Sequence, residues 1–423
     1  MYHVLIPLML LTMSCSSTCE QACTPPRVAT GRVIPVQPDN QLNTKIWIGG
    51  VFFHWYGMND NGLPNGQWYS PWPPLEGRDK WDGSVGFYAR QTMLYRYAGF
   101  NMIPFQDVHD RTQDQRNHLE AIKLLGDVNE RRKLMSTMND EYQMIVFPGV
   151  TAEELVPPKV SPFIDQGSFP EAHRVKDFTK QADKEEFYTH LSDMVRDMIE
   201  LVGYEGLTYY KNKLLVNVWY VPGAESAKRD FYPWVSDALY HEFGIEAYFS
   251  VHHAWKTAGA DEFNYLFSGK TDLVEWNAQG NVDLLVGYWP PDNAPHSYWV
   301  PRDGGKTLKR GLDIVLGRIQ DPCADRVKII WVESYNEYTE GSGVYPGRCG
   351  QMPADAYSGE PDRETCVDTP CIAKTDPSWY DVWGDCSNPR APFLYLDMLR
   401  EYNNTFLNWT NNARDIMNCE RGF

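Results

Sequence analysis

The chain has 423 residues, a formal net charge of −17 and 43% hydrophobic residues. That length and apolar content allow a substantial buried core, and the acidic balance argues against a nucleic-acid partner, because phosphate binding needs clusters of Lys and Arg that the sequence lacks. Aromatic residues make up 14% of the chain. Their rings either fill an aromatic-rich core or form surfaces for the flat C–H faces of sugars, and composition leaves both interpretations open.

The first 18 residues have the pattern of a signal peptide. The apolar run from Val4 to Met13 is too short to span a bilayer and fits the hydrophobic region of such a peptide, although no Lys or Arg precedes it. The letters TMSC at 12–15 also resemble a poor lipobox, with a lipidated Cys15 as the sole membrane attachment. Residues 19–44 form a polar, Pro-containing leader. We therefore expect an extracellular protein, secreted or held at the cell surface.

Apolar runs and helical periodicities alternate from residue 45 onward. Strands are expected at 45–53, 100–105, 142–150, 213–221, 245–251, 282–289 and 327–332, with 270–276 as a candidate for an eighth. Helices are expected at 86–99, 113–137, 183–202, 228–243 and 307–319. In the helix at 183–202, Asp183 and Glu186 form a capping pair and Gly203 is the stop.

Near-continuous apolar strands in a β-then-α order indicate a parallel sheet covered on both faces. The sequence therefore predicts an α/β fold, a (β/α)8 TIM barrel, as a single domain over residues 45–423. A doubly wound sheet is the alternative, but no Gly-rich phosphate loop follows any predicted strand.

Cysteine usage agrees with export. The chain has nine Cys, and eight remain if Cys15 is removed or lipidated, an even number compatible with four disulfides of undetermined pairing. The sequence has no paired C-x-x-C spacing with a nearby His, which is the pattern of a zinc site, so no metal is expected. Residues 342–390 are rich in Cys, Gly, Pro and Asp, and we expect a long disulfide-tied loop there rather than a second domain.

Two glutamates follow the last predicted strand, where a barrel gathers its catalytic groups. Glu337 and Glu340 are three residues apart, so a turn would bring their Cβ atoms to about 5–6 Å. Such a pair suits glycosidic-bond cleavage: one carboxyl protonates the leaving oxygen and the other stays ionised, since repulsion separates their pKa values. Retention and inversion both remain open. A solvated acidic loop and a calcium site are the alternative interpretations.

Two short motifs resemble glycoside hydrolase family 99, the endo-α-mannosidases. YNEYTEG (335–341) is similar to the N-E-W-x-E-G signature of that family and, more distantly, to family 71 α-1,3-glucanases. VFFHWYG (51–57) is similar to the F-Y-Y-x-W-Y-G that ends the family's first barrel strand. The resemblance implies a barrel acting on an oligo- or polysaccharide, α-mannan or α-glucan, without a cofactor.

The resemblance also assigns roles. It implies that Glu337 is the base, which deprotonates the 2-hydroxyl of the substrate, and that Glu340 is the acid/base on the leaving group. It implies that His54, Trp55 and Tyr56 line the sugar subsite. Tyr338, Thr339 and His54 replace the Trp, His and Pro of the family, which leaves both carboxylates in place and changes the shape of the subsite.

Other residues near strand ends are candidates for sugar contacts. We expect Asn336 and Tyr338, which frame the glutamates, Asp107 after the second strand and Trp289 after the strand at 282–289 to contact carbohydrate. Trp219 is either core or a sugar platform, and at most one of His252 and His253 faces the site. A non-catalytic carbohydrate-binding protein on an inactive barrel and a glycosyltransferase of the same superfamily are the alternatives to a hydrolase.

Overall fold

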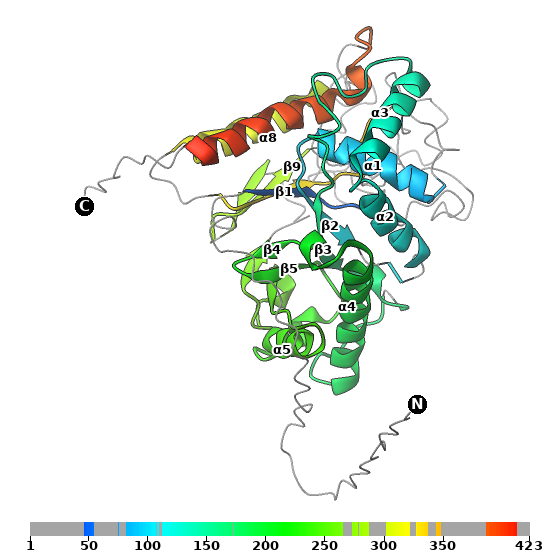
Figure 1. Ribbon diagram of the computed structural model, residues 1–423. Helices are drawn as coiled ribbons and strands as arrows, with labels where there is room; N and C mark the ends of the chain where they lie inside the picture. Colours follow the sequence, from blue (N-terminus) through cyan, green and yellow to red (C-terminus); the bar gives the residue numbers. More distant parts are fainter. Residues whose placement is uncertain are drawn as a thin grey trace, which may run out of the picture. The chain divides into compact units, whose positions relative to one another are not determined.

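The structure is a computed structural model (Figure 1), and all the residues it describes belong to one unit, Ile34–Phe423. It describes residues 46–54, 75, 82–106, 108–109, 112–171, 173–264, 273–277, 279–286, 302–321, 327–336, 344–347 and 386–412. The expected signal peptide and leader lie outside these residues, as does most of the expected Cys-rich loop.

Among the described residues, eight parallel strands follow one another in barrel order. They are β1 (Trp47–Gly50), β2 (Met102–Gln106), β3 (Lys159–Ile164), β5 (Lys213–Val218), β6 (Ala247–His252), β7 (Glu262–Asn264), β9 (Val282–Leu285) and β10 (Ile329–Glu333). Parallel ladders join β9, β10 and β1, and others join β2, β3, β5, β6 and β7. A parallel bridge between Phe52 and Phe105 links the two runs. The expectation of an α/β fold with a parallel sheet is confirmed.

Two short strands pair antiparallel to this set. β4 (Tyr209–Tyr210) pairs with β5, and β8 (Val274–Trp276) pairs with β9. The segment 270–276, a candidate for the eighth barrel strand, contains β8, which is not one of the parallel strands because it runs antiparallel to β9. The parallel strand at that place in the barrel order is β7, which is only three residues long.

Side chains join β7 to β9. Glu262 on β7 accepts hydrogen bonds from the Nδ2 of Asn281 at 2.7 Å, the Oγ of Ser250 at 2.7 Å and the hydroxyl of Tyr248 at 3.1 Å. The Oδ1 of Asn281 in turn accepts from the backbone N–H of Ile329 at 2.9 Å. Glu262 is buried, and that burial raises the pKa of its carboxyl group. One carboxyl therefore connects strands from both halves of the barrel.

Replacing Glu262 with Leu is expected to lower the free energy of unfolding by about 3 kcal/mol, because three buried donors lose their acceptor. Glu262→Gln keeps one acceptor oxygen and is expected to lose about half as much. Chemical denaturation measures both. The matched control is Glu401→Leu at an exposed position on the last helix, where a change within about 0.5 kcal/mol is expected. Equal stability of Glu262→Leu and wild type would contradict this role.

Helices follow the strands in the chain. They are α1 (Val85–Tyr97), α2 (Thr112–Leu124), α3 (Val128–Tyr142), α4 (Gln181–Val202), α5 (Phe231–Phe243), α6 (Lys306–Gln320) and α8 (Leu394–Asn412). The helical spacing recognised in the sequence is the buried face of α4, with Phe187, Leu191, Val195 and Met198 all buried. None of the helices in the described stretches combines the length and apolarity needed to cross a membrane.

Two buried apolar clusters flank the strands. The smaller one lies inside the strand ring and is formed by side chains from β1, β2, β3, β5, β6 and β10, including Trp47, Met102, Phe163, Leu215 and Trp331. The larger one packs the outer faces of the strands against the helices. Strands that are apolar on both faces therefore have the double burial that their sequences predicted.

Two local predictions are wrong, and one strand was not predicted. The segment 142–150 is not a strand: α3 ends at Tyr142, Gln143 takes a left-handed conformation, and turns follow. The helix expected over 113–137 is two helices, because Asp127 caps a new one by accepting from the N–H of Asn129. The strand β3 was missed because Pro157, Pro158 and Pro162 obscure its apolar pattern.

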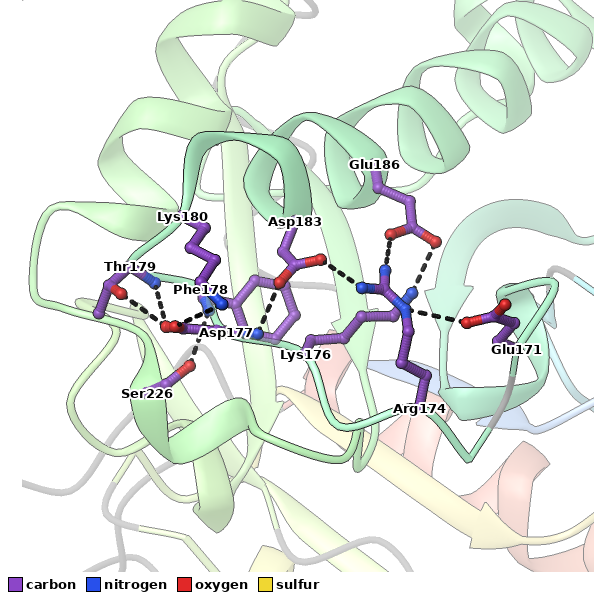
Figure 2. Close-up of polar contacts among 10 residues, drawn as sticks. All are labelled: Glu171, Arg174, Lys176, Asp177, Phe178, Thr179, Lys180, Asp183, Glu186 and Ser226. Carbon is purple, nitrogen blue, oxygen red and sulfur yellow. Dashed lines mark hydrogen bonds and ion pairs between the residues drawn. The ribbon is translucent and has the colours of Figure 1, made fainter.

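The start of α4 also differs from its expected form (Figure 2). Its N-cap is Lys180, which makes no side-chain capping bond, whereas Gly203 does end the helix with a φ of 73°. Asp183 and Glu186 face the preceding loop instead: Asp183 binds Arg174 at 2.9 Å, and Glu186 binds Arg174 and, at 2.6 Å, Lys176. The capping pair of the sequence is therefore an ion-pair network that fixes the loop after β3.

Candidate functional site

The two sequence motifs meet at the carboxyl ends of β1 and β10. Beyond the paired strands, the backbone N–H of Tyr335 donates to the carbonyl of Val51 at 3.1 Å. The side-chain amide of Asn336 then binds the backbone of Phe53 twice, with Oδ1 accepting from N–H and Nδ2 donating to C=O, both at 2.8 Å. Asn336 is fully buried. It holds the chain immediately before Glu337 against the first strand.

The chain after the glutamates returns to the same place. The backbone N–H groups of Val344 and Tyr345 both donate to the carbonyl of Tyr335, at 2.8 and 3.1 Å. The ring of Tyr335 stacks on Phe52 with centroids 5.4 Å apart, and its hydroxyl bonds the side chain of Gln91 at 3.0 Å. The described residues on either side of 337–343 are therefore held together at one buried point next to β1.

Some of the residues expected to form the site are described by the structure, and the others are not. Glu337, Glu340, Tyr338, Trp55, Tyr56, Asp107 and Trp289 lie outside the described residues. Asn336 and His54 are described, and both are buried with their polar atoms bonded inside the protein. In the structure their polar atoms hold other parts of the protein in place through these bonds and do not point to a ligand.

His54 begins a chain of buried hydrogen bonds with only one consistent arrangement of protons. Its Nδ1 lies 3.1 Å from the carbonyl of Gln106, so Nδ1 must carry the proton. Its Nε2, 2.9 Å from the Nδ1 of His118, must then accept, and the Nε2 of His118 accepts from the Thr92 hydroxyl at 3.1 Å. Burial lowers the pKa of His54 to about 3 and that of His118 well below its usual value. Both imidazoles are neutral.

A buried carboxyl group lies at the end of β3, next to this chain. Asp165 accepts from the Nε2 of Gln106 at 2.5 Å and from the backbone N–H of Gly167 at 2.7 Å. Burial raises its pKa to about 7 despite these bonds. Gln106 thus joins Asp165 to His54, and Asp107 follows it directly. Sequence reasoning missed Asp165 because it missed β3, and finding that strand would have placed an acid at its end.

His54 and Asp165 are expected to affect the pH dependence of stability in opposite directions. The folded pKa of His54 is below the unfolded value of 6.5, so its contribution falls by about 2 kcal/mol between pH 8 and pH 5. The folded pKa of Asp165 is above its unfolded value of 3.8, so its contribution rises by about 3 kcal/mol over that interval.

Urea unfolding at pH 8, 6.5 and 5 measures this balance. Relative to wild type, His54→Gln should lose less stability on acidification and Asp165→Asn should lose more. Curves that stay parallel to that of wild type for both variants would contradict these two assignments.

A pair of rings lies at the ends of the neighbouring strands β5 and β6. Trp219 and His252 are both partly exposed, with ring centroids 4.5 Å apart and an interplanar angle of 62°. Tyr220 is 39% exposed, and His253 is exposed beside His252. Within the described stretches, no three His, Cys, Asp or Glu side chains converge in a way that would hold a metal ion.

No protein-family model matches the sequence, and no curated protein matches it. Among solved structures, the chain is similar to the family 99 endo-α-mannosidase from Bacteroides thetaiotaomicron, with a TM-score of 0.53 and 12% identity over 86% of this chain and 98% of that one. A second structure of that enzyme, in complex with bis-tris-propane, has a TM-score of 0.51 at the same identity and coverage. At this identity the likeness shows the fold: the chain has an α/β fold like that of a family 99 glycoside hydrolase.

Proposed function

We propose that the protein is a glycoside hydrolase that cleaves a bond within an oligo- or polysaccharide, with Glu337 and Glu340 as its paired acid and base. The observation that carries the proposal is that the described residues on both sides of 337–343 are held at the same place. Asn336 is held to Phe53, and Val344 returns to Tyr335, so residues 337–343 begin and end at the carboxyl end of β10. A short segment with fixed ends restricts the separation of its two carboxyl groups, as paired acid–base chemistry requires.

The proposed chemistry uses each glutamate twice. Glu337 takes the proton of the 2-hydroxyl of the sugar while O2 attacks C1, and Glu340 gives its proton to the leaving oxygen as the C1–O bond breaks. Water then attacks C1 as the C1–O2 bond breaks, with Glu340 receiving the proton of the water and Glu337 returning one to O2. Two displacements give net retention, and the pair ends in its starting protonation states.

The fold relatives and the motifs together support a proposal for the substrate. The two solved structures reported above are of an endo-α-mannosidase, so α-mannan is the first substrate proposed and α-glucan the second. Trp55, Tyr56, Tyr338, Asp107 and Trp289 remain predicted sugar contacts. The apolar N-terminal run and the number of cysteines support export, with Cys15 as the site of any lipid anchor.

Reducing-end release from a panel of α-mannans and α-glucans tests the proposal. Wild type is expected to release oligosaccharides from at least one of them, and NMR of the first product should show the anomer of the bond that was cleaved. Binding to a polysaccharide without release, under conditions where the protein is folded, would instead support a non-catalytic carbohydrate-binding protein.

A further inference from the structure

Trp219 and His252 face the interior of the strand ring. β5 and β6 are paired in register, with Asn217 opposite Ser250. Alternate residues of a strand share a face, so Trp219 lies on the face of Leu215, and His252 on that of Tyr248. Leu215 and Tyr248 belong to the apolar cluster inside the strand ring, against which Trp219 packs. In the barrel order these two strands are the farthest from β10 and β1.

The backbone under both rings is fixed. The N–H of Trp219 donates to the carbonyl of Ile164 at 2.7 Å, and its carbonyl accepts from the indole N–H of Trp255 at 2.8 Å. The Nδ1 of His252 accepts from the N–H of Ala254 at 3.2 Å. A surface held in place in this way loses little conformational entropy when a ligand binds.

The loop that follows Trp219 is also held by hydrogen bonds from the loop that follows β3. The N–H of Lys176 donates to the carbonyl of Pro222 at 2.8 Å, and the N–H of Phe178 donates to the hydroxyl of Ser226 at 2.7 Å. Lys176 is itself held by Glu186, in the network around Arg174 and Asp183 (Figure 2). A Cβ at Gly223 would lie 1.9 Å from the carbonyl oxygen of Lys176, so only glycine permits this contact.

The chemistry of His252 is that of a neutral donor. Because its Nδ1 accepts a hydrogen bond, the proton of the neutral ring is on Nε2. Burial lowers the pKa of His252 to about 4, with the neighbouring His253 acting in the same direction. At neutral pH the ring therefore offers an N–H group without a positive charge, beside the indole of Trp219 and the exposed phenol of Tyr220.

We propose that Trp219, Tyr220 and His252 form a subsite for an uncharged pyranose, with a ring C–H face against the aromatic side chains and a hydroxyl oxygen accepting from His252 Nε2–H. Naming a sugar as the ligand rests on the proposed function. Trp219, Tyr220 and His252 carry no positive charge at neutral pH and the chain has a net charge of −17, so we expect neutral sugars to bind there more tightly than uronic or sulfated ones.

Equilibrium binding of mannotetraose, maltotetraose and tetragalacturonate tests the proposal, measured on full-length protein carrying Glu337→Gln to prevent turnover. At least one neutral tetrasaccharide should bind, and tetragalacturonate should bind at least tenfold more weakly. His252→Phe, which keeps a ring and removes the donor, should weaken neutral binding about tenfold, and His252→Gln should restore part of it. Trp219→Ala should weaken it at least as much. The exposed Tyr240→Ala on α5 is the matched aromatic control and should change nothing.

Three outcomes overturn the subsite: no binding of either neutral tetrasaccharide, equal binding of tetragalacturonate, or unchanged affinity in both His252→Phe and Trp219→Ala. Should Trp219→Ala fail to fold, the two His252 variants decide alone. Hydrolysis is scored separately on protein with Glu337 intact. Binding of a neutral tetrasaccharide that depends on His252, without any hydrolysis, would retain the subsite and reject the hydrolase. Hydrolysis by a protein whose affinity is unchanged by His252→Phe and Trp219→Ala would retain the hydrolase and reject the subsite.

Discussion

Replacing either Glu337 or Glu340 with Gln is expected to lower the rate of polysaccharide hydrolysis by about a thousandfold or more while leaving binding nearly unchanged. Each carboxyl group moves a proton in the transition state, and such transfers contribute about 10²–10⁴-fold to a rate. Gln keeps the size of the side chain and cannot exchange that proton. Initial rates of reducing-end release, with affinity measured separately by calorimetry, give both quantities.

The control for this prediction is Glu401→Gln on α8, an exposed position on a helix of the outer layer. It should match wild type in rate and affinity. Product release by Glu337→Gln and Glu340→Gln at the wild-type rate would remove the pair from the reaction and leave the role of base and acid to other groups.

Replacing Asn336 with Ala is expected to reduce kcat about a hundredfold, with KM changed only a few-fold. The amide of Asn336 fixes the backbone next to Glu337 through its two 2.8 Å bonds to Phe53, and a displacement of about 1 Å at a reacting group can cost that much rate. The same change should lower the free energy of unfolding by about 2–3 kcal/mol, because the N–H and C=O of Phe53 lose their partners inside the protein.

Asn403 provides a control with the same side chain and similar burial. It lies on α8, is 1% exposed, and donates from Nδ2 to the carbonyl of Ala98 at 2.7 Å. Asn403→Ala should also lose stability, whereas its kcat should stay at the wild-type value below the unfolding transition. If Asn336→Ala loses only as much kcat as Asn403→Ala, Asn336 holds the fold together without positioning Glu337.

The elements that could be predicted from the sequence are those whose burial leaves a local pattern. β1, β2, β5, β6, β9 and β10 were expected as apolar runs, and α4 and α6 as helical repeats. The hydrophobic pattern did not predict the structure where prolines, a very short strand or buried residues outside any strand altered it. Prolines conceal β3, three residues are too few to reveal β7, and 142–150 is apolar because turn residues such as Val146 and Phe147 are buried without pairing.

The sequence motifs predicted where the site lies, but they did not predict the role of each residue in it. The meeting of residues 51–54 with 334–336 was implied by the order of the motifs. The sequence could not show that the amide of Asn336 and the ring of His54 form hydrogen bonds inside the protein. Their partners, Phe53, Gln106 and His118, are brought next to them only by the fold. Asp165 was hidden along with β3. A residue of a sequence motif can therefore hold the backbone in place instead of contacting a ligand.

The most direct test of the proposed pair compares two substrates that differ only in the leaving group. Fluoride needs no protonation to depart, so Glu340→Gln should release fluoride from a glycosyl fluoride of the cleaved sugar in the first turnover at a rate within about tenfold of wild type. The same variant should be about a thousandfold slower on the natural linkage, and Glu337→Gln should be slow on both. Equal losses of Glu340→Gln on the two substrates would contradict its role as the proton donor.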